Sequence, residues 1–104
     1  MSEPQQVVYH YSVRPGDRLQ IPWHTTSRVV HTAFLDNSPD SLHFWVAMPM
    51  QPALFSREFY VVGTGMLFPA TDVVDGVAVW EGKGRMLPRI VFQLVRHEPG
   101  HTTN

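Results

Sequence analysis

The chain has 104 residues with no cysteine, and its formal net charge at pH 7 is −1. That length fits one domain with its own hydrophobic core, and the absence of cysteine excludes disulfides and thiolate metal sites. A charge so close to zero provides no general attraction for polyanions such as nucleic acids. The sequence shows neither a secretion-type N-terminus nor a long apolar run without charges, so we expect a cytoplasmic protein with no membrane segment.

The polar ends, residues 1–6 and 98–104, are expected to be flexible tails of a single β domain that spans residues 1–104. After the first tail, residues 7–13 alternate between apolar and polar side chains, which predicts a half-buried strand. The segment Arg14-Pro15-Gly16-Asp17 then predicts a turn, because proline suits its second position and glycine its third.

Turn-forming residues divide the rest of the chain into short β-rich segments, and no amphipathic helical stretch is present in the sequence. Asp75-Gly76 could form a hairpin turn. Gly82-Lys83-Gly84 separates the last two segments, residues 77–80 and 90–95. Pro88 indicates that the last strand is an edge or carries a bulge. We therefore predict an all-β domain, a small antiparallel β-sandwich or partly open barrel with six to seven strands. The further expected strands are residues 19–21, 28–35, 42–48, 58–62, 77–80 and 90–95.

Five segments of the chain follow one another in a recognisable order: Val8-Tyr9-His10-Tyr11, Leu42-His43-Phe44-Trp45-Val46-Ala47, Val61-Val62-Gly63-Thr64-Gly65 with Pro69, Gly76-Val77-Ala78-Val79 and Val91-Phe92-Gln93-Leu94. This order resembles an uncharacterised family of small all-β proteins encoded by bacteriophages and prophages. Where members of that family carry a polar residue after the second glycine of the Gly-Thr-Gly motif, this chain has Met66-Leu67-Phe68. The resemblance implies a phage-encoded protein that acts in the host bacterial cytoplasm or is built into the virion, and it implies no catalytic residue.

Two connections between predicted strands are apolar, although loops are normally polar. The first runs from Met48 to Phe55, and the second contains Met66-Leu67-Phe68. Such loops either fold back onto the core or contact a partner protein, and methionine and aromatic side chains suit adaptable contact surfaces. Trp23, between Pro22 and His24, could belong to either the core or the contact surface. The residues that we expect to bind a partner are Met50, Phe55, Met66, Leu67, Phe68 and Trp23.

Other kinds of site have weaker support in the sequence. Gly63-Thr64-Gly65 could form a backbone nest for an anion, but it also fits a strand end that needs a positive φ angle. No His-x-His or His-x-x-x-His pair occurs, and His10, His31 and His43 can converge only if their three strands are neighbours. No paired carboxylates or activated nucleophile can be recognised in the sequence. We therefore expect no metal, no cofactor and no enzymatic activity.

These patterns favour a non-enzymatic module that binds a host or phage protein, and the chain could also form a homodimer. Three alternatives stay open: a minor structural component of the virion, a small β-barrel that binds single-stranded nucleic acid, and a metal-dependent enzyme. In the second alternative, bases would stack on aromatic side chains beside arginines. The residues that could supply that surface are Arg28, Trp45, Tyr60, Arg85, Arg89 and Arg96.

Overall fold

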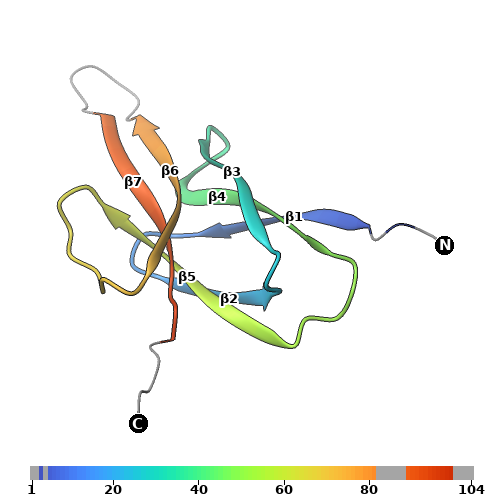
Figure 1. Cartoon of the computed structure of the whole chain (residues 1–104). Helices are drawn as coiled ribbons and strands as arrows, with labels where there is room; N and C mark the ends of the chain where they lie inside the picture. Colours follow the sequence, from blue (N-terminus) through green and yellow to red (C-terminus); the bar gives the residue numbers. More distant parts are fainter. Residues whose placement is uncertain (1–2, 4, 82–88, 100–104) are drawn as a thin grey trace, which may run out of the picture.

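The computed structural model describes residue 3, residues 5–81 and residues 89–99, and these form seven strands joined by turns and loops (Figure 1). The predicted all-β fold is confirmed: the strands make two antiparallel sheets, as in a small β-sandwich, and the sheets do not close into a barrel. The described residues form no helix, and hence no helix that could cross a membrane. The strands are β1 (Gln6–Val13), β2 (Arg18–Trp23), β3 (Arg28–Leu35), β4 (Ser38–Pro49), β5 (Phe55–Gly63), β6 (Val73–Glu81) and β7 (Arg89–Arg96).

The order of the strands in space differs from their order in the chain. The three-stranded sheet has the order β1-β4-β3, and the four-stranded sheet has the order β2-β5-β7-β6. In the second sheet, β5 and β6 both run antiparallel to β7 and lie on either side of it. The connection from β5 to β6 therefore has to pass from one side of β7 to the other, and this connection carries one of the two apolar loops (Figure 1).

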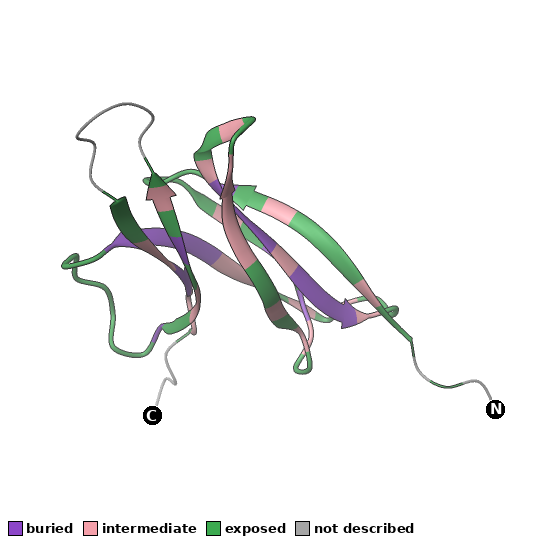
Figure 2. Ribbon diagram, turned by 90° about the horizontal axis from the view of Figure 1, so that it is seen from above, coloured by how far each residue is buried: buried purple, intermediate pink, exposed green. Residues whose placement is uncertain are grey.

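The core lies between the two sheets and is built from alternate residues of the strands. Leu42, Phe44 and Val46 of β4 are completely buried, and they share one hydrophobic cluster with Phe59 and Val61 of β5. The centroids of the Phe44 and Phe59 rings are 5.1 Å apart. Successive side chains of a strand point to opposite faces, which explains why the members of this cluster on β4 and β5 recur at every second position. Figure 2 shows the buried parts of the strands inside the molecule.

The turn predicted between the first two strands is confirmed. The backbone N–H of Asp17 donates to the carbonyl of Arg14 over 3.0 Å, and Gly16 has a φ angle of 95°. The second strand, expected over residues 19–21 and therefore to end before Pro22, continues to Trp23 as β2, and Pro22 lies within it opposite Ser56 of β5. A proline is tolerated there because β2 is an edge strand, whose outer N–H groups have no partner strand to lose.

The hairpin turn predicted at Asp75-Gly76 is wrong. β6 runs without interruption from Val73 to Glu81, and the two residues instead form a β-bulge, visible as a register shift against β7. The Asp75 carboxylate accepts a hydrogen bond from the Arg96 guanidinium over 2.7 Å, so it faces a partner on the neighbouring strand instead of bonding the backbone of a turn.

Pro88 predicted an edge or a bulge in the last strand, and β7 pairs with both β5 and β6 over most of its length. Only its first residues, 89–91, pair with β6 alone. Pro88, on which that prediction depended, and Gly82-Lys83-Gly84 lie outside the described residues. Of the expected tails, Gln6 already belongs to β1, whereas residues 100–104 lie outside the description.

The two sheets approach each other closely where β3 meets β6. The Thr32 hydroxyl donates to the carbonyl of Val77, which joins the edge of one sheet to the edge of the other. A methyl group added at Gly76 would lie 2.6 Å from Cγ2 of Thr32, so only glycine fits beside this contact.

Gly76→Ala is expected to lower the free energy of unfolding by about 1–3 kcal/mol, the usual cost of overpacking. Thr32 cannot rotate away without losing its hydrogen bond to Val77. Thr32→Ser removes the clashing methyl and keeps the hydroxyl, so the double variant G76A/T32S should recover most of the loss. Urea denaturation measures both variants, and an equal loss in the two would show that this clash is not the cause.

Candidate functional site

The connection from β5 to β6 begins with a tight turn at Gly63-Thr64-Gly65. The N–H of Met66 donates to the carbonyl of Gly63 over 3.0 Å, and Gly65 has a φ angle of 91°, a value that L side chains rarely adopt. Gly65 therefore serves the turn. The N–H groups of Gly63 and Thr64 are already used, by the Met66 sulfur at 3.2 Å and by the Val91 carbonyl at 3.2 Å, so they do not form an open anion-binding nest.

This first turn is fixed to β7. The Thr64 hydroxyl donates to the Val91 carbonyl over 3.1 Å and accepts a hydrogen bond from the side-chain amide of Gln93 over 3.2 Å. Together with the backbone bond from Thr64 to Val91, these contacts hold the start of the connection against the neighbouring strand.

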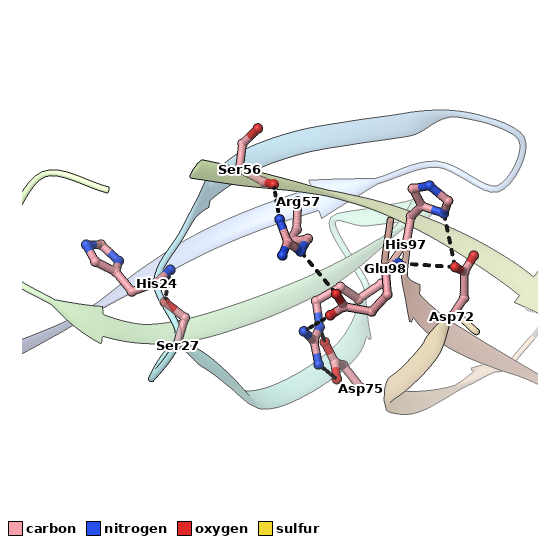
Figure 3. Close-up of polar contacts among 9 residues, drawn as sticks. His24, Ser27, Ser56, Arg57, Asp72, Asp75, His97 and Glu98 are labelled. Atoms are coloured by element: carbon pink, nitrogen blue, oxygen red, sulfur yellow. Dashed lines mark hydrogen bonds and ion pairs between the residues drawn. The ribbon is translucent and has the colours of Figure 1, made fainter. Parts of the chain in front are cut away.

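The other end of the connection is held by the buried carboxylate of Asp72 (Figure 3). Its oxygens accept hydrogen bonds from the Tyr60 hydroxyl, from Nδ1 of His97 at 3.0 Å and from the N–H of Glu98 at 3.1 Å. Burial alone would raise the pKa of Asp72, but these donors outweigh it, and the pKa lies below its usual value. Asp72 thus joins the connection to β5 and to the segment after β7.

Glu98, at the start of the expected C-terminal tail, belongs to the same network. Its carboxylate accepts from Arg57 of β5 over 3.2 Å and pairs with Arg96 of β7, and Arg96 also bonds Asp75 (Figure 3). The network therefore ties the chain down beyond the last strand, through Glu98. Its side chains are partly buried, so these ion pairs are screened less by solvent than surface pairs are.

An aspartate that orients a histidine is also a component of catalytic triads. In the residues that the structure describes, no hydroxyl nucleophile is hydrogen-bonded to His97, whose contacts are to Asp72 and to the Glu58 backbone. The geometry of this pair is accounted for by its role in holding the connection in place.

Between these two fixed ends, the apolar side chains of the connection point into solvent. Leu67 is 97% exposed, Met66 59% and Phe68 36%. Beneath the connection, on the outer face of the four-stranded sheet, a small second cluster of Tyr60, Val62 and Val95 is buried. Asp72 of the connection accepts a hydrogen bond from Tyr60 of this cluster. The main core is built from strand residues and contains no side chain of the connection.

Exposed valines extend this apolar area along the outer face of β6 and β7. The register places Val74 beside Val95, Val77 beside Gln93 and Val79 beside Val91. Since Gln93 bonds Thr64 and Val95 lies beside Tyr60, this face borders the β5–β6 connection. We call the combined area the loop–sheet surface. Its residues are Met66, Leu67, Phe68, Val74, Val77, Val79 and Val91.

The other residues expected to bind a partner lie elsewhere. Met50 is 63% exposed in the β4–β5 connection. This connection and the β5–β6 connection, which carries Leu67, lie at opposite ends of β5 (Figure 1). Phe55 is half-buried under the Arg57 guanidinium, and Trp23 is 3% exposed in the core beside Phe59. The structure thus brings Met66, Leu67 and Phe68 together, separates Met50 from them and places Trp23 inside the sandwich.

Sequence reasoning missed several exposed apolar residues. Leu54, beside Phe55, is 96% exposed, and the valines of β6 form one face of a continuous strand. The period-two alternation of Val77 and Val79 indicates an exposed strand face. Because a hairpin turn is predicted at Asp75-Gly76, the expected strand begins only at Val77 and does not include Val74.

Three histidines gather on the outer face of the three-stranded sheet, because β1, β4 and β3 are neighbours. Nε2 of His10 and Nδ1 of His43 are 2.8 Å apart, so one nitrogen donates and the other accepts. The Trp45 ring lies between His10 and His31, with ring centroids 4.7 Å and 5.2 Å away. No group of three or more potential metal ligands is arranged for a metal ion in the described parts of the chain.

The residues considered for stacking nucleic-acid bases are spread over the molecule. Trp45 is flanked by imidazoles on the three-stranded sheet, whereas Tyr60 is buried in the other sheet and bonded to Asp72. Arg96 is paired with Asp75, and Arg89 with Glu81 at 2.8 Å. Arg28 is exposed at the start of β3, and Arg85 lies outside the described residues.

Tyr60→Phe is expected to lower the free energy of unfolding by about 1–3 kcal/mol, because the buried Asp72 carboxylate loses one donor. Burial and the bond to Asp72 raise the pKa of Tyr60 to about 12. In the unfolded chain, the pKa of tyrosine is about 10. The stabilisation from Tyr60 is therefore complete below about pH 10 and is lost between about pH 10 and 12. Denaturation curves across this range should show the decline in the wild type and a smaller one in Tyr60→Phe; parallel curves would contradict the assignment.

His43 makes the folded state sensitive to acid. Its side chain is buried, and its Nε2 has no hydrogen-bond partner among the described residues. Burial first, and then the neighbouring His10, lower the pKa of His43. The unfolded chain therefore takes up this proton more readily than the folded one, so stability is complete above about pH 6.5 and falls as the pH drops below it.

His43→Gln is accordingly expected to reduce the loss of unfolding free energy between neutral and mildly acidic pH. Urea denaturation of the wild type and the variant at both pH values measures this difference. An identical pH dependence in the two proteins would show that another group is responsible.

Comparison with known proteins identifies one family. No curated protein and no solved structure matches the chain significantly. A family model described as a domain of unknown function, DUF7352, matches residues 4–82, which includes β1 to β6 and the whole β5–β6 connection. Because this match covers well over half of the sequence, the chain belongs to the DUF7352 family.

Proposed function

We propose that this protein is a non-enzymatic module that binds another protein through the loop–sheet surface. The observation that carries the proposal is Leu67, which is 97% exposed on a connection whose two ends are fixed by hydrogen bonds. A leucine that only covered the core would be buried. An exposed apolar patch, such as the one to which Leu67 belongs with Met66, Phe68 and the valines of β6 and β7, marks a binding surface.

The energetics of binding favour this surface over the other exposed residues. Burying one leucine side chain is worth about 1.5–3 kcal/mol, and Met66 and Phe68 lie next to Leu67 in the chain. The contacts of Thr64 and Asp72 hold the connection before it binds, so less conformational entropy is lost on association.

The surroundings of the loop–sheet surface also resemble those of an interface. The exposed valines of β6 and β7 contribute an uncharged area, and the Glu81–Arg89 ion pair lies at its end. An apolar centre with a charged rim is the usual anatomy of protein–protein contacts.

The resemblance to small phage and prophage proteins supports a partner in an infected bacterium. We propose a host or phage protein in the bacterial cytoplasm as the partner, with assembly into the virion as the second location for the same surface. The family match itself assigns no partner, since it describes a domain of unknown function.

Leu67→Asp is expected to abolish capture of the partner, whereas Leu54→Asp should leave it intact. The two leucines are matched, since they are 97% and 96% exposed, but they lie in connections at opposite ends of β5. The measurement is an affinity pull-down from a lysate of the bacterial host, with the tagged wild type and both variants.

Both substitutions replace exposed side chains, so both variants should unfold at the same urea concentration as the wild type. Capture that survives Leu67→Asp would contradict the proposal. Loss of capture in both variants would mean that general apolar adhesion, not the loop–sheet surface, is responsible.

A further inference from the structure

The edges of the two sheets are protected very unequally. Unpaired edges attract other strands, and proteins that remain monomeric protect them with proline, charged side chains or bulges. β2 carries Pro22 and Arg18, and β3 and β6 each contain a bulge. β3 and β6 also face each other through the Thr32–Val77 hydrogen bond, so each partly covers the other.

β1 has none of these protections. Its sequence, QVVYHYSV, contains no proline and no Asp, Glu, Lys or Arg. It pairs with β4 over eight consecutive residues without a register shift, and among the described strands β4 is its only partner. Alternate N–H and C=O groups of β1 therefore face outward along a straight and uncharged edge.

A groove lies beside this edge. It has a volume of about 530 Å³ and lies between the inner side of β1, the end of β2 and the β4–β5 connection. None of its lining side chains is a carboxylate, a lysine or an arginine. The aromatic and apolar part of the lining consists mainly of Tyr9, Tyr11, Pro22, Pro49 and Met50. A strand added to the edge of β1 would direct every second side chain toward this groove, and the lining favours uncharged, apolar or aromatic side chains there.

We propose that the occupant is a second copy of this chain, bound through antiparallel pairing of the two β1 strands. β1 itself has the required pattern, because Val7, Tyr9 and Tyr11 alternate on its inner side, where Val7 and Tyr11 pack against the core and both tyrosines line the groove. A two-fold axis perpendicular to the sheet places the inner side chains of each copy toward the groove of the other. The two three-stranded sheets then form one six-stranded sheet, and the interface is self-complementary, as closed dimers require.

This dimer leaves the loop–sheet surface free. That surface belongs to the other sheet, on β6, β7 and the β5–β6 connection. The dimer would carry two copies of it, which would strengthen binding to a partner that offers two sites. The dimer and the proposed function are tested separately, because they involve different residues.

The test is the mass of the full chain in solution, measured by size-exclusion chromatography with light scattering over a range of concentrations. We expect the wild type to have twice the 11.9 kDa mass of one chain and to dissociate on dilution. Val8→Lys should shift the protein to the monomer mass, because it places a charged side chain on β1, the strand that pairs with the β1 strand of the second copy. Val77→Lys is the matched control on β6, since the two valines are 54% and 56% exposed, and it should leave the dimer intact.

Hydrogen exchange of the wild-type β1 amides gives a second measurement that needs no substitution. In the dimer, all amides between residues 7 and 13 should exchange slowly, and alternate ones should become fast on dilution. A wild type that is monomeric at all concentrations, with alternate β1 amides always fast, would overturn the proposal. A dimer that survives Val8→Lys and is disrupted by Val77→Lys would overturn it too, and would place the contact on the loop–sheet surface.

Discussion

The structure depends on the packing of Phe44 against Phe59 across the gap between the sheets. Both side chains are fully buried, and they belong to β4 and β5, each of which has a hydrogen-bonded strand on both sides. The alternation of side chains along a strand then determines what remains on the outer faces. On β4 it places His43 and Trp45 outside, and on β5 it places Tyr60 there, where it meets Asp72.

The polar network around Asp72 explains how an apolar loop can stay exposed. A flexible loop with Met66, Leu67 and Phe68 could fold back over the nearest apolar surface. Here one end of the connection is bound to Val91 and Gln93, and the other end is fixed by the buried carboxylate. The main core is already filled by residues of the strands, so the loop gains little by covering it. Exposure of this loop therefore follows from the fixed ends and the filled core together.

Sequence alone could predict the fold class and most strands, because period-two alternation and the turn at Arg14–Asp17 are local signals. It could not decide which apolar residues are exposed. Trp23 and Leu67 are both large and apolar beside turns, yet one is 3% and the other 97% exposed, since burial depends on which strands become neighbours. Asp75-Gly76 shows the same limit: the dipeptide favours a turn locally, but pairing of β6 with β7 and the contact from Asp75 to Arg96 make it a bulge. The convergence of His10 and His43 likewise required the order β1-β4-β3, which no local pattern contains.

The position of β7 between β5 and β6 has a consequence for biosynthesis. β7 is the last of the seven strands in the chain, yet it provides the hydrogen-bonding partner of β6 and one of the two partners of β5. During translation, β5 and β6 leave the ribosome before the strand that joins them, so the four-stranded sheet can be completed only once residues 89–96 have been released. Until then, the apolar strands made earlier have an unfilled place at the centre of their sheet, so the domain should reach its native state only after residues 89–96 have left the ribosome.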